Sequence, residues 1–385
     1  MNDLSQLQQE NYHEFLKFVK SNIDPHANQW EKEECIPKSI IELCSKAGYL
    51  GGSLPLKYGG QGWDCLTYGM FSEAIAKSST SLGGLFNVHT MIEQTILRWG
   101  TDEQKQRWLL PMAEGEIIGA FALTEPESGS DISSITTEYK LSGEKIILNG
   151  KKRWITFGAL ADIILVFGKL DGKAVACLVE KKTPGLKITP IKDMLGFKAG
   201  HLAELHFDNC VVKKENMIGR EGSALIYIAL SALEFGRINV AFAALGILRG
   251  CLEACSQHVL KRKSFGKCLM DHGAIRKMIA DMGVDYESAR LLCINSTIAK
   301  NENLPDASEK IMIAKYFTTM AAARHSGNAV QVMGALGCHE NCSVSRYYRD
   351  SKMLEIIEGS NEIHQMLLGK SFARQFAKNR KNIKA

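Results

Sequence analysis

The sequence predicts an α+β protein in which a helical region, a block of β-strands and a second helical region follow one another along the chain. Apolar residues follow helical spacing up to about residue 115, alternate with polar residues in the middle, and return to helical spacing from about residue 223. We therefore expect an N-terminal helical domain over 1–116, a middle antiparallel, barrel-like β domain over 117–222, and a C-terminal four-helix bundle over 223–385. A chain of 385 residues with 45% hydrophobic content can build these cores.

The N-terminal region has apolar residues on one helical face and clear helix breaks. The helical spacing is set by Leu4, Leu7, Tyr12, Phe15, Leu16 and Val19. Asp24-Pro25 and the glycine-rich stretch 57–62 interrupt the pattern. This region is therefore expected to be a set of helices.

The middle region alternates with a period of two. Leu205 and Phe207 stand between polar neighbours, as expected for a strand with one buried face. Asn149-Gly150 and Asp171-Gly172 are dipeptides typical of two-residue hairpin turns. We therefore expect antiparallel strands joined by hairpins at both places.

The C-terminal region contains long stretches without helix breakers. Residues 224–262 contain no proline and only three glycines, Gly236, Gly246 and Gly250. Long helices packed as a bundle follow from this pattern. No internal repeat or low-complexity segment indicates another architecture.

Composition excludes several classes of function. The 47 basic and 42 acidic residues give a net charge of +5, which is not the one-sided basic field of a nucleic-acid-binding protein. No run approaches the roughly 18 apolar residues of a membrane span, and the N-terminus does not resemble a signal peptide. The eleven cysteines lack metal-ligand spacing and are interpreted as reduced thiols. We expect a cytoplasmic protein without a metal.

Three segments contain residues suited to chemistry on a planar ligand. In residues 121–131, small and hydroxyl-bearing residues around Gly129 would let the backbone approach such a ligand. Trp154 could pack against its rings. Glu358 follows Ile356 and Ile357, and burial among apolar groups would raise its pKa as a general base requires. Taken singly, these are also features of a polar loop, a core tryptophan and a surface glutamate.

In this order and spacing, residues 124–131, 153–156 and 356–363 resemble the acyl-CoA dehydrogenase flavoproteins, and the resemblance runs from about Trp30 to about Gly369. The resemblance implies an FAD-dependent acyl-CoA dehydrogenase of fatty acid metabolism, an oxidoreductase. In such an enzyme Glu358 removes the α-proton of an acyl thioester while hydride passes from the β carbon to flavin N5, so that α,β-desaturation results. Some relatives place the base at the position that is Gly236 here, where no side chain exists.

The resemblance also implies the FAD-binding residues. In the three segments named above and in residues 121–123, these are Phe121, Leu123, Thr124, Gly129, Ser130, Trp154, Ile155, Thr156, Ser360 and Glu362. Arg262 and Ser264 would contact the FAD of a neighbouring subunit, and Phe265 beside them would also bind the cofactor. Gln331, Val332, Gly334 and Ala335 would form a pyrophosphate and adenosine segment. Ala335 replaces a frequent glycine, and Gly273 replaces a glutamine that reaches the cofactor in many relatives.

Substrate contacts follow from the same resemblance. The implied residues are Ser130, Glu234, Phe235, Gly236, Arg237, Ile357 and Gly359. Ile357 replaces a frequent tyrosine beside the base, which widens the range of acyl groups to consider. Residues 194–201 lack the family's frequent arginine and serine and resemble divergent members that act on carrier-protein-tethered acyl groups.

The implied partners are an acyl thioester, electron transfer flavoprotein as acceptor and further copies of this chain in a homotetramer. One alternative is an acyl-carrier-protein-tethered acyl dehydrogenase of secondary metabolism. Another, from a different class, is a non-catalytic flavin-binding or assembly protein. Direct oxidation by oxygen is less consistent with 385 residues, because acyl-CoA oxidases are usually longer. Acyl chain length, carrier and acceptor are not encoded in a readable motif.

Overall fold

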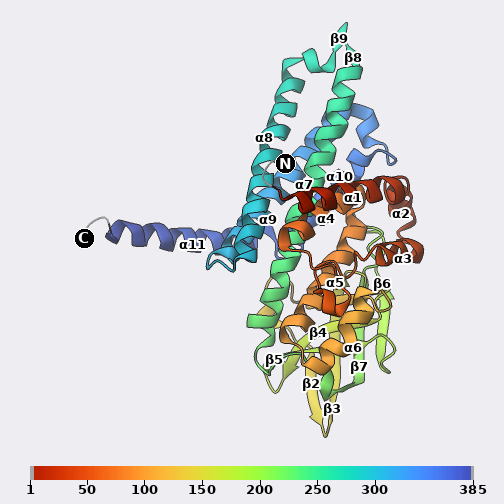
Figure 1. The fold of residues 1–385 in the computed structure, drawn as a ribbon, viewed down its shortest axis with the longest axis vertical. Coiled ribbons are helices and arrows are strands. Elements are labelled where there is room, and N and C mark those ends of the chain that lie inside the picture. The colour runs from red at the N-terminus through yellow and green to blue at the C-terminus, as the bar shows by residue number, and fades with distance from the viewer. Residues whose placement is uncertain (1–3, 383–385) are drawn as a thin grey trace.

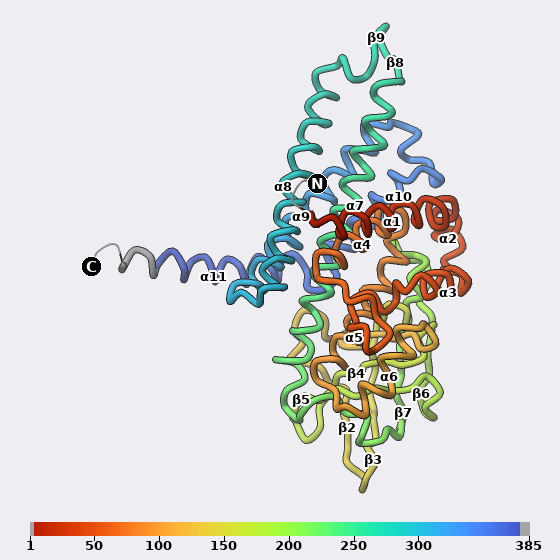
Figure 2. The backbone as a smooth tube through the Cα atoms, viewed as in Figure 1, coloured from red at the N-terminus to blue at the C-terminus, as the bar shows by residue number. Residues whose placement is uncertain are grey.

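The structure is a computed structural model that describes residues 4–382. A helical N-terminal part lies between a β-sheet and a bundle of long C-terminal helices (Figure 1). The tube in Figure 2 shows the sheet at one end of the long axis and the tip of a helical pair at the other. The spatial order therefore differs from the chain order, in which the strands come between the two helical regions.

The N-terminal part consists of α1 (Gln6–Asn22), α2 (Ala27–Glu33), α3 (Lys38–Lys46), α4 (Cys65–Ser78), α5 (Thr80–Trp99) and α6 (Asp102–Ala113). Ser5 and Gln8 form a capping box at the start of α1, and the helix ends before Asp24-Pro25, as predicted. Nearly every residue of α4 and α5 is buried. These two helices are therefore central, with partners on more than one side.

Seven strands form one sheet: β1 (Gly119–Ala122), β2 (Glu138–Ser142), β3 (Lys145–Ile155), β4 (Ile163–Leu170), β5 (Lys173–Glu180), β6 (Leu186–Pro190) and β7 (Ala203–Lys213). Their order is β1-β4-β2-β3-β7-β6, with β5 paired to β4. Leu205 and Phe207 in β7 are buried between exposed or half-buried neighbours, as predicted. The sheet is mixed, because β1 and β2 both pair with β4 in parallel, and a purely antiparallel sheet was wrong.

One of the two predicted hairpins is also wrong. Asp171-Gly172 does turn β4 into β5, but Asn149-Gly150 lies inside β3, where the register against β7 shifts. Gly150 has φ of +148° and packs against Thr137, and the Asn149 side chain accepts a hydrogen bond from the backbone of Asn209. The dipeptide therefore forms a bulge, and the β2–β3 turn lies at residues 143–144.

The C-terminal part begins with a π-helical turn (Ala224–Ala229) that continues into α7 (Leu230–Lys261). It continues with α8 (Gly273–Asn301), α9 (Ala307–Met333), α10 (Ser343–Ile356) and α11 (Asn361–Asn382). Helices α7 to α10 form the bundle, and the short β8–β9 hairpin (Lys263–Ser264 and Lys267–Cys268) caps the far tip of α7 and α8 (Figure 1). Helix α11 projects sideways from the bundle.

The helix over Ala224–Lys261 corrects one expectation from composition. Among residues 4–382, it is the one helix long and apolar enough to cross a membrane by these measures alone. However, 78% of its apolar window is buried inside the fold, where α7 packs against α4, α5, α8, α9 and α10. Its composition is therefore explained by its place at the centre of the core.

Several large apolar side chains on the C-terminal part are exposed in the described chain. Val284, Leu291 and Ile298 are exposed one heptad apart on α8. Phe265 at the β8–β9 tip is 94% exposed, and α11 exposes Met366, Leu367 and Phe376. We call these the α8 stripe, the hairpin tip and the α11 face.

Candidate active site

The turn between α10 and α11 places Glu358 in an uncommon backbone conformation. Glu358 has φ of 56° and Gly359 has φ of 90°, so two successive residues are left-handed. A glutamate rarely adopts this region because its Cβ crowds the backbone. The turn reverses the chain and directs the carboxylate toward α5 and α7. Within residues 4–382, the backbone N–H of Glu358 has no hydrogen-bond acceptor.

The Glu358 carboxylate lies between these two helices. Its Oε1 accepts a hydrogen bond of 2.8 Å from Nδ2 of Asn87 on α5. On α7, a Cβ added to Gly236 would lie only 2.4 Å from Glu358 Oε2. The backbone carbonyl of Glu358 accepts from Nε of Arg237 at 3.2 Å. The absence of a side chain at Gly236 is therefore what makes room for the carboxylate of Glu358.

The environment of Glu358 favours a carboxyl group that can hold a proton. Burial raises its pKa, and the hydrogen bond from Asn87 and the charges of Arg237 and Lys315 offset only part of that rise. Such a group matches the requirement for a general base acting on a weakly acidic carbon. The raised pKa therefore agrees with the role expected from the sequence.

Lys315 on α9 forms hydrogen bonds to the turn that carries Glu358. Its buried ammonium donates to the carbonyls of Gly359 (2.8 Å) and Glu355 (3.3 Å) and to Oδ1 of Asn361 (3.2 Å). Burial lowers the pKa of Lys315 to about 7, and three acceptors supply what water would otherwise provide. Burial, with Lys315 and Arg237 adding to it, lowers the pKa of the neighbouring His364 to about 3, so that imidazole is neutral.

The Trp154 segment of the middle domain reaches the same face of α5. Trp154 has φ of 62°, and the residue is 45% exposed. Cγ2 of Thr156 lies 3.3 Å from where a Cβ on Gly84 would be. Gly84 precedes Asn87 by three residues, so both positions share one face of the helix. The structure thus brings the Trp-Ile-Thr segment and Glu358 to one side of α5.

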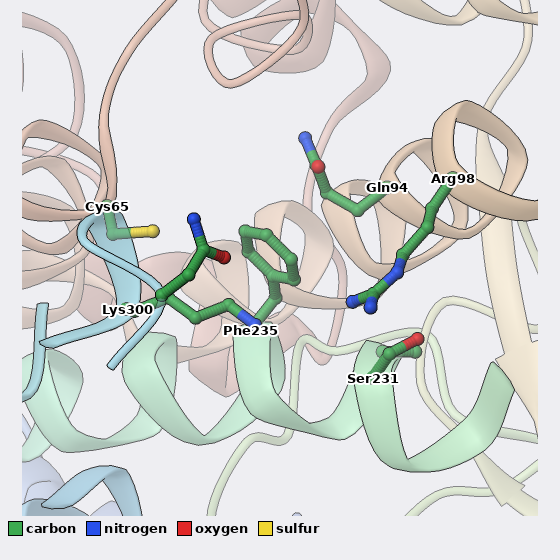
Figure 3. A pocket seen from close by; sticks show the side chains of 8 residues that line it. Cys65, Gln94, Arg98, Ser231, Phe235 and Lys300 are labelled. Atoms are coloured by element: carbon green, nitrogen blue, oxygen red, sulfur yellow. The ribbon is translucent and has the colours of Figure 1, made fainter. Parts of the chain in front are cut away.

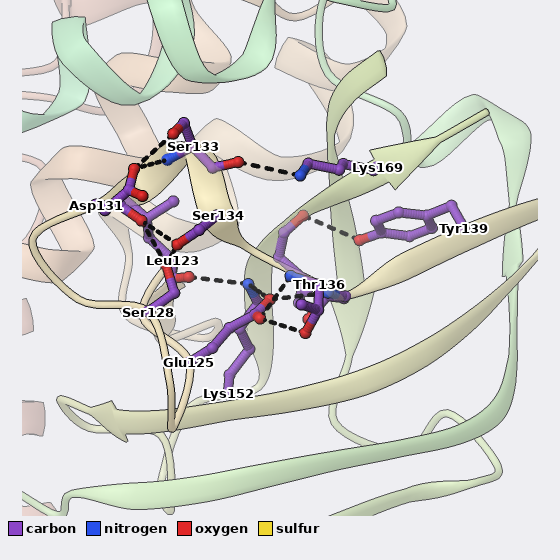
Figure 4. A network of polar contacts seen from close by, with 12 residues as sticks. Leu123, Glu125, Ser128, Asp131, Ser133, Ser134, Thr136, Tyr139, Lys152 and Lys169 are labelled. Atoms are coloured by element: carbon purple, nitrogen blue, oxygen red, sulfur yellow. Dashed lines mark hydrogen bonds and ion pairs between the residues drawn. The ribbon is translucent and has the colours of Figure 1, made fainter. Parts of the chain in front are cut away.

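A buried ion pair fixes the loop over residues 124–131 (Figure 4). Lys152 on β3 donates to Glu125 and to the carbonyl of Leu123, each at 2.8 Å. Burial alone would raise the pKa of Glu125, but hydrogen bonds from Lys152, Thr137 and Thr136 outweigh it and lower the pKa to about 2. Burial lowers the pKa of Lys152 to about 8. This pair joins the loop to the strand that carries Trp154.

The other residues of the loop and turn are partly accessible. Thr124 accepts a backbone hydrogen bond from Arg153, and a Cβ on Gly129 would meet nothing within 4 Å. By burial, Phe121, Thr124, Thr156, Ile357, Gly359 and Ser360 are intermediate, Gly129, Ser130 and Glu362 are exposed, and Leu123 and Ile155 are buried. Ile356, expected to shield the base, is 54% exposed in this chain.

Two groups of expected cofactor residues lie apart from this site. Arg262, Ser264 and Phe265 are at the hairpin tip, at the opposite end of the molecule from the sheet (Figure 1). Gln331, Gly334 and Ala335 are exposed at the end of α9, whereas Val332 points into the core with 3% exposure. A single copy of the chain does not bring the hairpin tip to Trp154. Their proposed roles therefore depend on a neighbouring subunit.

Glu234 and Phe235 belong to a different flank of α7 from Gly236. Phe235 lines a cavity of about 260 Å³ (Figure 3). Its other lining residues are Cys65, Gln94, Arg98, Ser231, Ala232, Lys300 and Asn303. Glu234 pairs with Lys300 and accepts from Ser308. Because successive helical residues differ by about 100° in direction, these side chains face away from the base.

Sequence reasoning did not identify Asn87, Lys315 or the Glu125–Lys152 pair. Asn87 is a single amide within a buried apolar stretch of α5, which is the one local signal for it. Its partner Glu358 is 271 positions away. Lys315 likewise stands as a lysine on the buried face of α9. A charged or amide side chain at a core position was the available clue.

Comparison with known proteins gives consistent matches along the chain. Sequence models of the N-terminal, middle and C-terminal domains of acyl-CoA dehydrogenases match residues 5–116, 120–210 and 226–373. The mitochondrial short-chain specific acyl-CoA dehydrogenase of Rattus norvegicus is 34% identical over 93% of this chain and 88% of its own. An acyl-CoA dehydrogenase of Bacillus subtilis (strain 168) is 36% identical over 92% of this chain and 94% of its own.

Solved structures match equally well. Butyryl-CoA dehydrogenase from Megasphaera elsdenii superposes with a TM-score of 0.93 at 32% identity, covering 96% of this chain and 99% of its own. A chain from a structure of the electron transferring flavoprotein of Acidaminococcus fermentans gives 0.93 at 35% identity (97% and 99%). The prolyl acyl carrier protein oxidase AnaB gives 0.90 at 26% (96% and 99%). The predicted fold class is confirmed.

Proposed function

Because this chain belongs to the acyl-CoA dehydrogenase family, we propose that Glu358 is the base with which it catalyses α,β-desaturation of an acyl thioester. The protein is an oxidoreductase that acts on a CH–CH bond. The observation that carries the role of Glu358 is its carboxylate, directed between α5 and α7 over Gly236 and given a raised pKa by burial. Glu234, the carboxylate two residues before Gly236 on α7, is bound to Lys300 instead.

We propose FAD as the cofactor. Its fit rests on the exposed indole of Trp154, the accessible loop at Gly129 and Ser130, and Thr156 against α5. Together these offer an aromatic surface and hydroxyl and backbone donors suited to a planar, polar-edged ring system. When bound, FAD supplies the acceptor for the hydride that leaves the β carbon. The Glu125–Lys152 pair would hold the loop in a fixed position relative to the strand that carries Trp154.

In the proposed reaction the chain binds, orients and deprotonates. Glu358 accepts the α-proton on its carboxylate. The Glu358 N–H, which has no acceptor in the described part of the chain, is suited to donate to the thioester oxygen as charge develops there. Arg237 donates to the carbonyl of Glu358, and Lys315 donates to the carbonyls of Glu355 and Gly359, so both side chains hold the turn that carries this N–H.

We propose a short acyl group as substrate. The relatives with this similarity include short-chain specific enzymes, and the polar amide of Asn87 next to the base limits the apolar surface available to a long chain. Coenzyme A is the proposed carrier, and an acyl carrier protein is the second candidate. The similarity to the prolyl acyl carrier protein oxidase and the unusual residues 194–201 favour testing the latter. Electron transfer flavoprotein is the proposed acceptor.

The oligomer is proposed to be a homotetramer. The α8 stripe, the hairpin tip and the α11 face expose large apolar side chains that a monomer leaves in water. Placing Arg262 and Ser264 on a neighbour's FAD explains why they lie far from Trp154 in their own chain. A second copy is thus the occupant that satisfies both observations.

The test is an anaerobic titration of purified protein with short, branched and long acyl-CoAs and one acyl carrier protein thioester, following the visible flavin band. We expect bleaching with a short acyl-CoA, none with Glu358→Gln, and normal bleaching with the control Glu14→Gln, which changes an exposed glutamate of α1. Preferential bleaching by the carrier protein thioester would select the second candidate. FAD that is bound and reducible by dithionite, yet silent with every thioester, would contradict the proposal.

A further inference from the structure

The amide of Asn87 is placed where it controls the Glu358 carboxylate. We propose that Asn87 is a positioning residue that fixes the orientation of the Glu358 carboxylate and favours its ionised form. This inference rests on the proposed role of Glu358 as the base. It adds a residue of α5 that no family motif in the sequence includes.

The contact defines the orientation of the carboxylate from two sides. An ionised carboxylate only accepts hydrogen bonds, so the 2.8 Å contact requires the Asn87 amide to donate through Nδ2. The opposite oxygen, Oε2, lies against Gly236, where α7 has no side chain. Rotation of the carboxyl would break the contact with Asn87 or press the group onto α7. The donor and the helix surface therefore allow one orientation.

The apolar surroundings of Asn87 indicate that its amide is needed for the interaction with Glu358. Asn87 is 3% exposed and lies between Phe86 and Val88, which are also buried. Its Oδ1 has no hydrogen-bond partner among the described residues. A buried unpartnered acceptor is unfavourable for folding, and a leucine of similar size would avoid it. Among the residues from 4 to 382, the contact with Glu358 is the one hydrogen bond of this side chain.

The charged groups around Glu358 act at other atoms. Arg237 reaches it from α7 but donates to the backbone carbonyl, and Lys315 from α9 donates to the carbonyl of Gly359. His364 from α11 is neutral, and the phenol of Tyr68 on α4 pairs with Asn239. Within residues 4–382, the Asn87 amide is the group that hydrogen-bonds to the carboxylate itself. Removing it should therefore change the proton affinity of Glu358 directly.

The experiment isolates proton abstraction from oxidation. The FAD-loaded protein is reduced with dithionite, so that hydride transfer cannot follow, and exchange of the substrate α-proton with deuterated solvent is measured against pH. In Asn87→Leu we expect the acidic limb of the profile to move up by about one pH unit or more, with an about tenfold slower exchange below the limb. Asn87→Asp, which places a second carboxyl at the base, should move it further.

A matched control separates positioning from folding. Ser72→Ala disturbs the nearby buried network of Tyr68 and Asn239 without touching Glu358, and should leave the limb in place. FAD content and thermal melting verify that each variant is folded. The band of the protonated carboxyl in infrared difference spectra against Glu358→Gln gives a second readout that needs no substrate.

Different results would overturn the role of Glu358 as the base and the role of Asn87 beside it. Exchange that persists in Glu358→Gln would overturn the proposed base. Exchange lost in Glu358→Gln, with an unmoved limb and carboxyl band in both folded Asn87 variants, would overturn the role of Asn87 alone. A limb that moves in Ser72→Ala as well would also overturn it, because the effect would then be one of general packing.

Discussion

The substitution Gly236→Ala should slow catalysis without weakening the fold. The added Cβ would lie 2.4 Å from Glu358 Oε2 and 2.6 Å from Cδ, whereas ordinary contacts begin near 3.4 Å. The carboxylate must therefore retreat by about 1 Å, and its hydrogen bond to Asn87 lengthens or breaks. The clashing atoms are the far end of a flexible side chain, so the backbone of α7 can remain where it is.

The two consequences have opposite signs. A 1 Å misplacement of a reacting group can cost about 100-fold in rate, which corresponds to about 2.7 kcal/mol of transition-state energy. Alanine in a helix interior is more favourable than glycine by about 0.5–1 kcal/mol. We therefore expect flavin reduction by substrate to slow by about two orders of magnitude while the melting temperature stays constant or rises.

Stopped-flow reduction of the flavin and thermal unfolding measure the two effects on the same preparation. Gly327→Ala on α9 is the control, because its Cβ would meet Tyr348 at an ordinary 3.6 Å and gains the same helix propensity. Gly327→Ala should be stabilised and fully active. Gly236→Ala that reduces its flavin at the wild-type rate would refute the placement of the base over α7.

Three further substitutions test other parts of the site. Glu125→Gln leaves Lys152 as a buried unpaired cation and should lower the free energy of unfolding in urea by about 3–5 kcal/mol; adding Lys152→Met should restore most of it. Since the folded pKa of Glu125 lies below its unfolded value, its stabilisation is present at neutral pH and lost as pH falls from 4.5 toward about 2, and Glu125→Gln should lack this acid-sensitive component. Lys315→Met removes the donors to Gly359 and Glu355 and should slow flavin reduction by about tenfold or more in a folded protein, as stopped-flow and melting curves would show. Leu291→Glu places a charge in the α8 stripe and should give a smaller species in light scattering with less bound FAD; an unchanged mass would remove this stripe from the interface.

The sequence predicted the large features because they are repeated along the chain. Helical spacing and the alternation around Leu205 and Phe207 each involve many residues, so a few exceptions do not obscure them. The parallel pairs of β4 with β1 and β2 were missed because strand direction depends on long connections, not on local pattern. Asn149-Gly150 was misread because a glycine at positive φ is found in bulges as well as in hairpin turns.

For the site too, features with a local sequence pattern were predicted, and features that depend on long-range contacts were missed. Segments with several characteristic residues, such as 124–131 and 356–363, could be recognised locally. The contact between Asn87 and Glu358 joins residues 271 positions apart through one hydrogen bond, and no local pattern contains that information. The separation of the hairpin tip from Trp154 also depends on the lengths of α7 and α8 in space.

At Glu358, the residue that the reaction requires is less favourable for folding than glycine would be, because the backbone there is left-handed. A glutamate at φ of 56° costs about 1–2 kcal/mol relative to glycine, which adopts that conformation freely. Replacement of the base by glycine would therefore abolish the reaction and relieve the turn. Without selection for activity, mutation at this position would tend to yield well-folded copies that have lost the chemistry. Descendants of this chain could persist as stable, inactive proteins, and stability would not reveal the loss.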